Sequence, residues 1–426
     1  MSSDQPAAPR PTSDPGRTLL GIGWFLCAVF FFYAFVQRVA PSVMVEELMR
    51  DFAVGGALVG NLSAFYYYAY AGSQIPVGVM LDRFGPRRLI TVAVALVAVG
   101  SFVFAAAETL WMAYLGRMLI GFGCAFSFAG ALNYAAIWMP AHRFATLSGG
   151  AQLLGVLGGI TGQAPLGAAV EAFGWRPMML VVAVFGAALA IGCGLILRDR
   201  PRGDGATARP RLLAELKRAA GSAQVWLAAM FGLAMTSAML AFGGLWGVPY
   251  VMQAYGYPKA EAALLVSTLF VGWGIGAPLF GWLADRYRRR KPFMILGAIL
   301  STVGIVLAVY LPHAGAVTLA VALMVQGLGA SSMVLSFSVG RENTPLWAAG
   351  ATVGIINGCV VGSGAVLQPL LGWVLDLAWD GTMVEGARVY TAAAYESAFL
   401  VLPAIGLFGL AIALVVRETY GKGVDV

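Results

Sequence analysis

Twelve long apolar stretches constrain this chain more than any other feature of its sequence. Each has about twenty or more residues with few charges, which is the length that an α-helix needs to cross roughly 30 Å of hydrocarbon. Only 11% of the residues are charged, against about 25% in a soluble domain, so the polar surface is too small for a water-soluble fold. We therefore predict an all-α integral membrane protein. The stretches cover residues 18–41, 57–81, 88–107, 110–138, 146–170, 177–197, 224–250, 260–284, 292–312, 314–340, 347–375 and 394–416.

One long polar segment divides these stretches into two sets of six. It contains RDRPRGDGATARPR, followed by the short amphipathic piece LLAELKRAA. A polar, Pro- and Gly-containing segment of this length is typical of a linker between two structural units. We therefore predict five parts: an N-terminal tail (1–17), a six-helix bundle (18–197), a linker (198–223), a second six-helix bundle (224–416) and a C-terminal tail (417–426).

The positions of the basic residues predict how the chain is oriented. Of the 27 Lys and Arg residues, 21 fall in the loops and tails on the side of the two termini, and five fall on the opposite side. Short cytoplasmic loops of membrane proteins carry such an excess of positive charge. We expect a multi-pass protein, in a bacterial inner membrane, with both termini and the linker in the cytoplasm.

Two sequence matches between the halves indicate a duplication. GVMLDRFGPRR (78–88) and GWLADRYRRRK (281–291) share Gly, Asp and Arg at an offset of 203. GQAPLGAAVEAFGW (162–175) and LQPLLGWVLDLAW (367–379) share Gln, Pro, Gly, an acidic residue and Trp at offsets of 204 or 205. Two matches at nearly one offset predict two six-helix repeats in parallel orientation, a construction used by secondary transporters.

These motifs resemble those of the major facilitator superfamily. GVMLDRFGPRR is similar to the signature between helices two and three of that family, and RMLIGFG (117–123) to its RxxxGxG signature in helix four. The stretches 65–89 and 36–44 look more like importers of the sugar-phosphate and organic anion:cation symporter branch, or of the phagosomal nutrient transporter type, than like multidrug exporters. The resemblance covers the whole chain. It implies a monomeric secondary or facilitative transporter that moves a small anionic or zwitterionic solute by alternating access.

The resemblance also implies a conformational latch in the loop after the second helix. In the family, the Asp and Arg of this loop bridge neighbouring helix ends and hold the halves together on the cytoplasmic side. An acidic residue at the C-terminal end of a helix needs a partner, because the helix dipole is negative there. In the second copy, Arg290 and other basic residues are expected only to fix the orientation of the chain in the membrane. Arg288 occupies the position that corresponds to Gly85 of the first copy. The latch residues are Gly78, Asp82, Arg83 and Arg87, with Asp285 and Arg286 in the second copy.

Two arginines within the apolar stretches are candidates for binding the solute. Arg117 lies about seven residues into its stretch, where a charge costs ~2.5–3.5 kcal/mol on insertion scales. It either takes part in substrate or coupling chemistry or clamps two helices together. Arg38 precedes Pro41 and can give a carboxylate or phosphate two parallel hydrogen bonds. Its alternative role is to extend toward the outer headgroups.

Uncharged polar residues complete the predicted binding site. Tyr66 and Tyr70 share one helix face deep in the second stretch and either line a polar cavity or bond across helix contacts. Gln163 and Gln368, each followed closely by a proline, are repeat partners and candidates for pseudo-symmetric cavity positions. Asn357 joins them more weakly. Each amide has an alternative role as a hydrogen bond between helices.

Several other functions remain open or are disfavoured by the sequence. No stretch has an Asp or Glu near its middle, so a coupling proton or ion, exchange and facilitated diffusion all stay open. There is no P-loop, no CxxC and no cluster of nucleophile and base, which disfavours ATP-driven transport, a metal or cofactor, and a membrane enzyme. The two-fold repeat suits alternating access better than a channel. An efflux pump for drugs or metabolites and an iron or siderophore transporter are the alternative functions; nucleic acid is not an expected partner.

Overall fold

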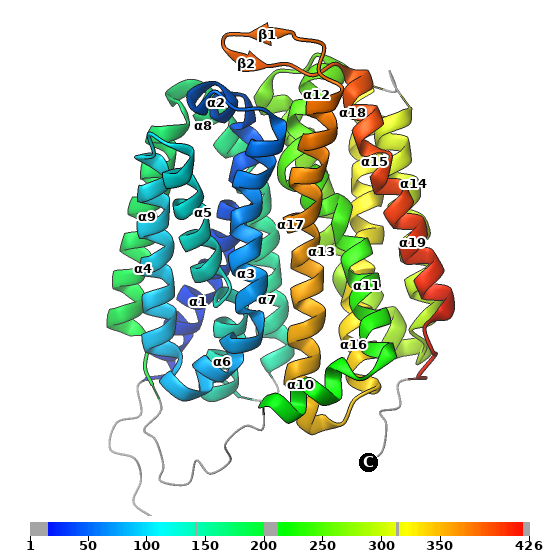
Figure 1. Ribbon diagram of the computed structural model, residues 1–426. Coiled ribbons are helices and arrows are strands. Elements are labelled where there is room, and N and C mark those ends of the chain that lie inside the picture. Colours follow the sequence, from blue (N-terminus) through cyan, green and yellow to red (C-terminus); the bar gives the residue numbers. More distant parts are fainter. Residues whose placement is uncertain (1–15, 141–142, 200–211, 312–314, 421–426) are drawn as a thin grey trace, which may run out of the picture.

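Long helices run side by side between two ends of an elongated bundle (Figure 1). The computed structural model describes residues 16–140, 143–199, 212–311 and 315–420. One end, here called the hairpin end, carries the antiparallel strands β1 (Met383–Val384) and β2 (Ala387–Arg388). At the opposite end, here called the linker end, α1 begins and α10 (Leu212–Ala220) lies.

The first half of the chain forms one group of helices. Its turns are marked by residues with special backbone preferences, such as Gly85 and Gly174, whose positive φ angles of 82° and 84° an L-residue rarely adopts. The elements are α1 (Arg17–Val39), η1 (Ala40–Val43), α2 (Val45–Phe52), α3 (Gly56–Phe84), α4 (Pro86–Ala105), α5 (Leu110–Cys124), α6 (Ser127–Trp138), α7 (Phe144–Thr161), α8 (Ala164–Phe173) and α9 (Trp175–Ile196).

The second half forms the other group, and it contains the only π-helical segment in the described part of the chain. The elements are α11 (Ala223–Ala238), the π-helical η3 (Met239–Trp246), α12 (Gly247–Tyr255), α13 (Lys259–Tyr287), α14 (Lys291–Tyr310), α15 (Gly315–Ala330), η4 (Ser331–Met333), α16 (Val334–Glu342), η5 (Leu346–Ala348), α17 (Ala349–Leu377), α18 (Ala392–Phe399) and α19 (Val401–Val415).

Eleven helical spans of the described chain are long and apolar enough to cross a membrane. The twelfth predicted crossing is α3, which has 29 residues and runs the length of the bundle beside α5 and α17 (Figure 1). Its mean hydropathy is lower because Asn61, three consecutive tyrosines and Gln74 replace aliphatic residues. Apolar side chains cover the outside of the bundle; Val184, Ile191 and Leu195 on α9, for example, are about two-thirds exposed. A lipid-facing helix surface has this character.

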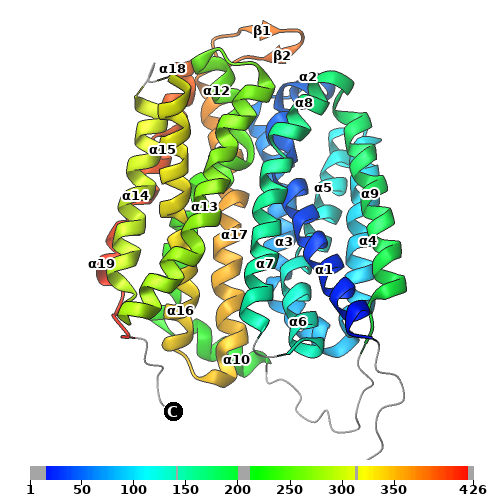
Figure 2. The same cartoon turned by 180° about the vertical axis from the view of Figure 1, so that it is seen from behind.

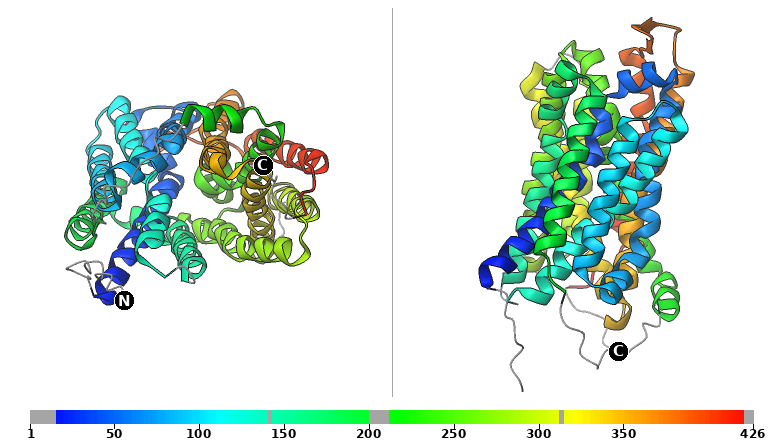
Figure 3. Two further views of the ribbon diagram at one scale, coloured as in Figure 1. Left: turned by 90° about the horizontal axis from the view of Figure 1, so that it is seen from below. Right: turned by 90° about the vertical axis from the view of Figure 1, so that its left-hand side faces the viewer.

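The two halves lie next to each other and meet along two seams. On one face α3 lies against α17, and on the other α7 and α8 lie against α13 (Figures 1 and 2). The view from the linker end shows the blue-to-green helices on one side and the green-to-red helices on the other (Figure 3). Glycines allow the close approach along the first seam: a Cβ on Gly372 would lie 2.1 Å from the carbonyl oxygen of Gly56. Small residues at helix contacts are typical of membrane bundles.

Candidate functional site

Arg38 lies inside the bundle and contacts aromatic rings of α1 and α3. Its side chain is 7% exposed, and its Nε donates to the Tyr66 hydroxyl at 3.4 Å. The guanidinium carbon lies 4.4 Å from the ring centroid of Phe35 and 5.2 Å from that of Tyr70. The alternative that Arg38 extends to the headgroups is therefore wrong, because its side chain is buried among these rings.

Arg117 is completely buried on α5 and lies over the same tyrosine ring. Its guanidinium carbon lies 5.1 Å from the ring centroid of Tyr66, and that of Arg38 lies 5.8 Å from it. Its Nη1 donates a hydrogen bond to the carbonyl oxygen of Gln37 at 2.8 Å. Its Nε and Nη2 atoms have no hydrogen-bond partner in the described structure. A buried donor without a partner is costly, so these two atoms are available to a bound acceptor.

No carboxylate in the described part of the structure pairs with the arginines of this arginine–tyrosine cluster. All ion pairs between described side chains lie at the two ends of the bundle. At ~1.5 Å per residue, Tyr66 and Tyr70 lie roughly 15 and 21 Å along α3 from the hairpin end. The cluster is thus near mid-depth, where an unpaired charge is most expensive. Its geometry favours a negatively charged or strongly accepting ligand.

Gln163 and Gln368 meet the same segment of the second half. The Nε2 of Gln163 donates to the carbonyl oxygen of Gly243, and the Nε2 of Gln368 donates to that of Leu240 at 2.7 Å. Both carbonyls belong to η3, whose π-helical turns shift the regular helix hydrogen bonds; such segments are frequent at functional sites. The Oε1 atoms of both glutamines are buried without a partner. The repeat-related pair therefore offers two unused acceptors.

Asn357 lies closer to the linker end than the other predicted site residues. Its Nδ2 donates to the Oε1 of Gln74, which joins α17 to α3. Since Asn357 precedes Gln368 by three helical turns, it belongs to the lower part of the seam between the halves. The structure thus brings together Arg38, Arg117, Tyr66 and Tyr70, places the glutamines at a similar depth, and sets Asn357 beside Tyr70, with a side-chain hydrogen bond between the two.

Two residues that the sequence did not single out complete the cluster. Gln37 holds Arg117 through its backbone carbonyl, and its side chain donates to Tyr33 and Ser101. The Tyr67 ring contacts Gly364, and its hydroxyl faces Gly244 of η3 beside the amide of Gln368. A signal for Tyr67 was present in the run of three tyrosines, but only the fold shows that this ring faces the other half.

At the linker end, the first copy of the predicted latch forms its described contacts within one half. The Nη2 of Arg87 donates to the carbonyl oxygen of Gly194 at 2.8 Å, at the end of α9. Asp199 accepts from the backbone nitrogen of Arg87 at 2.9 Å. Arg83 is exposed and lies over the Phe84 ring at 5.4 Å. The surroundings of Gly78 and the side chain of Asp82 fall outside the described part of the structure.

In the second copy, Arg290 is an ion-pair residue, and the expectation that it only anchors topology is wrong. It is 8% exposed and contacts Asp285 at 2.7 Å and Glu342 at 2.8 Å. Arg286 is exposed. The turn keeps a positive φ even though Arg288 stands in place of a glycine; its φ is 49°. Burial of Arg290 between α13 and α16 could not be read from a run of basic residues.

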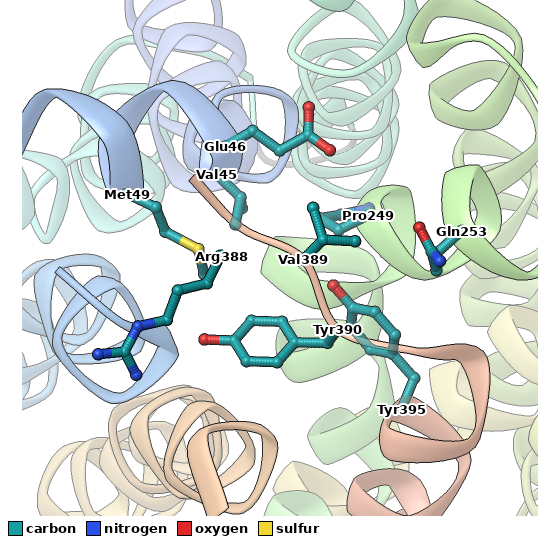
Figure 4. Close-up of a pocket in the computed structure, with 9 residues that line it drawn as sticks. All are labelled: Val45, Glu46, Met49, Pro249, Gln253, Arg388, Val389, Tyr390 and Tyr395. Carbon is teal, nitrogen blue, oxygen red and sulfur yellow. The ribbon is translucent and has the colours of Figure 1, made fainter. Parts of the chain in front are cut away.

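The hairpin end is closed by polar contacts between the halves. Lys259 of α13 pairs with Glu47 of α2, and Asp376 of α17 accepts from the first backbone nitrogens of α3. Behind these contacts lies a small crevice between α2, α12 and the hairpin (Figure 4). Glu46 lines the crevice from α2, and Tyr390 lines it from the hairpin. Burial raises the pKa of Glu46. Lys259 lowers this pKa, and the nearby carboxylates of Glu47 and Glu385 raise it further.

Comparisons with known proteins agree on one family. The sequence profile of the Major Facilitator Superfamily matches residues 26–248 and 235–424. The chain is 23% identical over 66% of its length to a probable sulfoacetate transporter of Cupriavidus necator, covering 68% of that protein. It is 22% identical over 88% of its length to a putative tartrate transporter of Agrobacterium vitis, covering 87% of it. A crystal structure of a bacterial homolog of the lysosomal transporter Spinster, inward-facing and unoccupied, matches with a TM-score of 0.78 at 16% identity, over 94% of this chain and 97% of that one.

Proposed function

Because the chain belongs to the Major Facilitator Superfamily, we propose that this membrane transporter carries a small organic anion through the site around Arg38 and Arg117. The observation that carries the proposal is the pair of buried guanidiniums that both lie over the ring of Tyr66. Arg117 keeps two donor atoms without a partner there. A carboxylate or sulfonate matches these donors in charge and in geometry, since guanidinium binds such groups through two parallel hydrogen bonds.

Electrostatic repulsion supports an anion rather than a neutral solute. Two like charges that lie over one buried ring repel each other more strongly than they would in water, because the effective dielectric constant inside a protein is lower. Desolvation of each charge adds a penalty on the order of several kcal/mol. An anion between or beside Arg38 and Arg117 would offset both costs. A neutral sugar would offset neither, although its hydroxyls could bond to the same donors.

The names of the relatives point to the same class of solute. Sulfoacetate and tartrate, the solutes in two of those names, are small organic anions. The free Oε1 atoms of Gln163 and Gln368 could accept hydrogen bonds from a hydroxyl or ammonium group on the same solute. We therefore include hydroxy acids and zwitterionic amino acids in the proposed class.

The proposed transport path runs between the two halves. We propose that the hairpin end, closed by Asp376 and Lys259, faces the outside of a bacterial inner membrane. The linker end, with both termini, would face the cytoplasm, as the distribution of basic residues predicts. The five-part division of the chain into tails, bundles and linker, and a monomeric state, belong to the same proposal. Rocking of the halves would open the site to one side at a time.

Binding measurements on the purified full-length chain test the proposal. Thermal unfolding is followed with tartrate, sulfoacetate, glycine and a neutral sugar, for the wild type and for Arg38→Gln and Arg117→Gln. We expect at least one anion to raise the unfolding temperature, and each substitution to weaken its binding by about 100-fold, equivalent to ~2.7 kcal/mol. Arg218→Gln, which removes an exposed charge from α10, is the matched control. Stabilisation by the sugar alone, or anion binding that both site variants retain, would contradict the proposal.

A further inference from the structure

The positive charge of the site is fixed, whichever side the site faces. Arginine does not give up its proton in proteins, so Arg38 and Arg117 both stay charged through a transport cycle. Both lie in the first half, on α1 and α5, and therefore move together. The two arginines donate to the Tyr66 hydroxyl and to the backbone carbonyl of Gln37. These partners provide dipoles but no negative charge.

The described acidic side chains cannot neutralise these arginines at their present positions. Asp376 and Glu47 are used at the hairpin end, and Asp285 and Glu342 at the linker end, in ion pairs with other residues. Alternating access requires a stage in which both ends are closed and the site is cut off from water. An empty site at that stage holds two buried charges without a counter-charge, which is the least favourable arrangement of buried ions.

We propose that this transporter is an obligatory anion exchanger, in which the site changes sides only when it holds an anion. This inference rests on the proposed function, because it takes the bound anion as the missing counter-charge. The anion lowers the energy of the closed stage, so inward and outward movement each require one. Net uptake would need the empty site to return, and that step is the one the two guanidiniums oppose. A coupling proton would add positive charge to the site and so would not help the empty carrier to return.

Distance measurements test the inference without requiring the natural solute. Donor and acceptor fluorophores are placed on Glu108→Cys and Leu311→Cys, exposed positions at the hairpin end of the first and second halves, with the native cysteines replaced by alanine, and single molecules are followed in time. In chloride buffer without organic anion we expect the wild type to change between its shorter and its longer distance only rarely. For Arg117→Gln we expect these transitions at least about ten times as often, since about 1.4 kcal/mol removed from a barrier raises a rate tenfold. Arg218→Gln, which loses an exposed charge, should behave like the wild type.

Each result of this measurement bears on the inference. Frequent transitions in the wild type without organic anion would show that the empty site changes sides freely, and would overturn it. Equally rare transitions in the wild type and in Arg117→Gln would also overturn it, because removal of the charge would then release nothing. The proposed function fails separately, when none of the tested anions binds, whatever the distances are.

Uptake into proteoliposomes provides the second test, with labelled tartrate and labelled sulfoacetate as probes. Wild-type uptake should be at least about tenfold faster into vesicles that contain the same unlabelled anion than into vesicles that contain chloride only. With Arg117→Gln the two rates should approach each other, while the KM for uptake rises. Equal wild-type rates, or accumulation driven into chloride vesicles by a pH gradient, would contradict exchange. If neither probe is transported, the distance measurement decides alone.

Discussion

The carboxylate of Asp376, at the end of α17, caps the first turn of α3 at Gly56, with 2.9 Å between its Oδ1 and the Gly56 backbone nitrogen. Its Oδ2 accepts from the nitrogen of Ala57, also at 2.9 Å. α3 has no side-chain cap of its own. Tyr390 and Arg388 hold the carboxylate from the hairpin, at 2.6 and 3.1 Å. A helix of one half thus receives its N-terminal cap from the other half.

Loss of this cap should open the hairpin end. Asp376→Asn keeps the shape of the side chain but leaves one acceptor oxygen for two backbone donors and removes the charge that the helix N-terminus and Arg388 favour. We expect the closed state to lose about 2 kcal/mol, a roughly thirtyfold shift in population. Spin-label distances between positions 108 and 311 measure the shift. Glu171→Gln, at the exposed repeat partner of Asp376, is the control, and equal shifts in both variants would contradict a specific role for the cap.

The glycine contacts between α3 and α17 give a second prediction. Alanine at Gly372 would place its Cβ 2.1 Å from the Gly56 carbonyl oxygen, so the two helices must separate. We expect Gly372→Ala to destabilise the closed hairpin end by about 1–3 kcal/mol, the usual cost of overpacking. Gly362, on the same helix, has no atom within 4 Å of an added Cβ. Gly362→Ala should therefore leave the distances unchanged and stabilise the helix by up to about 1 kcal/mol in thermal unfolding.

Hydropathy alone was enough to predict the helices, because a chain in lipid must satisfy its backbone hydrogen bonds within each helix. The same reasoning covers α3 only partly, since several of its polar residues, such as Tyr66, Tyr67 and Tyr70, are buried in the protein. Contacts between the halves could not be predicted: Asp376 and Gly56 are 320 residues apart, and no local pattern links them. The all-α family fold that the motifs implied is confirmed.

The side-chain contacts of the candidate site, like the contacts between the halves, could be predicted only in part from the sequence. Gln163 and Gln368 were paired through the repeat, and they do meet one segment, but the π-helical turns of η3 have no sequence pattern that would reveal them. The burial of Arg38 was left open because η1 and α2, which follow it in the chain, were not foreseen. The binding roles of these residues stay predictions.

The ring of Tyr66 should matter more for binding than its hydroxyl. Both guanidiniums lie against this ring, whereas the hydroxyl receives one long hydrogen bond of 3.4 Å from Arg38. We expect Tyr66→Phe to weaken anion binding by less than about fivefold, on the order of 1 kcal/mol for one hydrogen bond. Tyr66→Ala removes both cation–π contacts and should weaken it more than about tenfold. Titration of tartrate or sulfoacetate by calorimetry compares the variants; equal losses would contradict this role of the ring.

The crevice at the hairpin end predicts a dependence on pH through Glu46. Burial raises the pKa of this carboxyl in the closed state, and Glu47 and Glu385 add to the effect while Lys259 opposes it; Arg388, Tyr390 and Tyr395 also line the crevice. If opening exposes Glu46 to water, its pKa falls back toward the ordinary value, so the closed state binds more protons than the open one. Acidification on this side should then favour closure, and the closed state should lose stability as the pH rises through the raised pKa.

Glu46→Gln isolates this effect, because its amide is neutral at every pH. We expect the variant to favour the closed distance between positions 108 and 311 and to lose the part of the pH dependence that lies above the ordinary glutamate range. The measurement covers about pH 5 to about pH 8, where ordinary carboxylates stay ionised. Glu171→Gln should keep the wild-type profile, since that side chain is exposed. A wild-type pH profile in Glu46→Gln would assign the titration to another group, because the substituted amide cannot release a proton in this range.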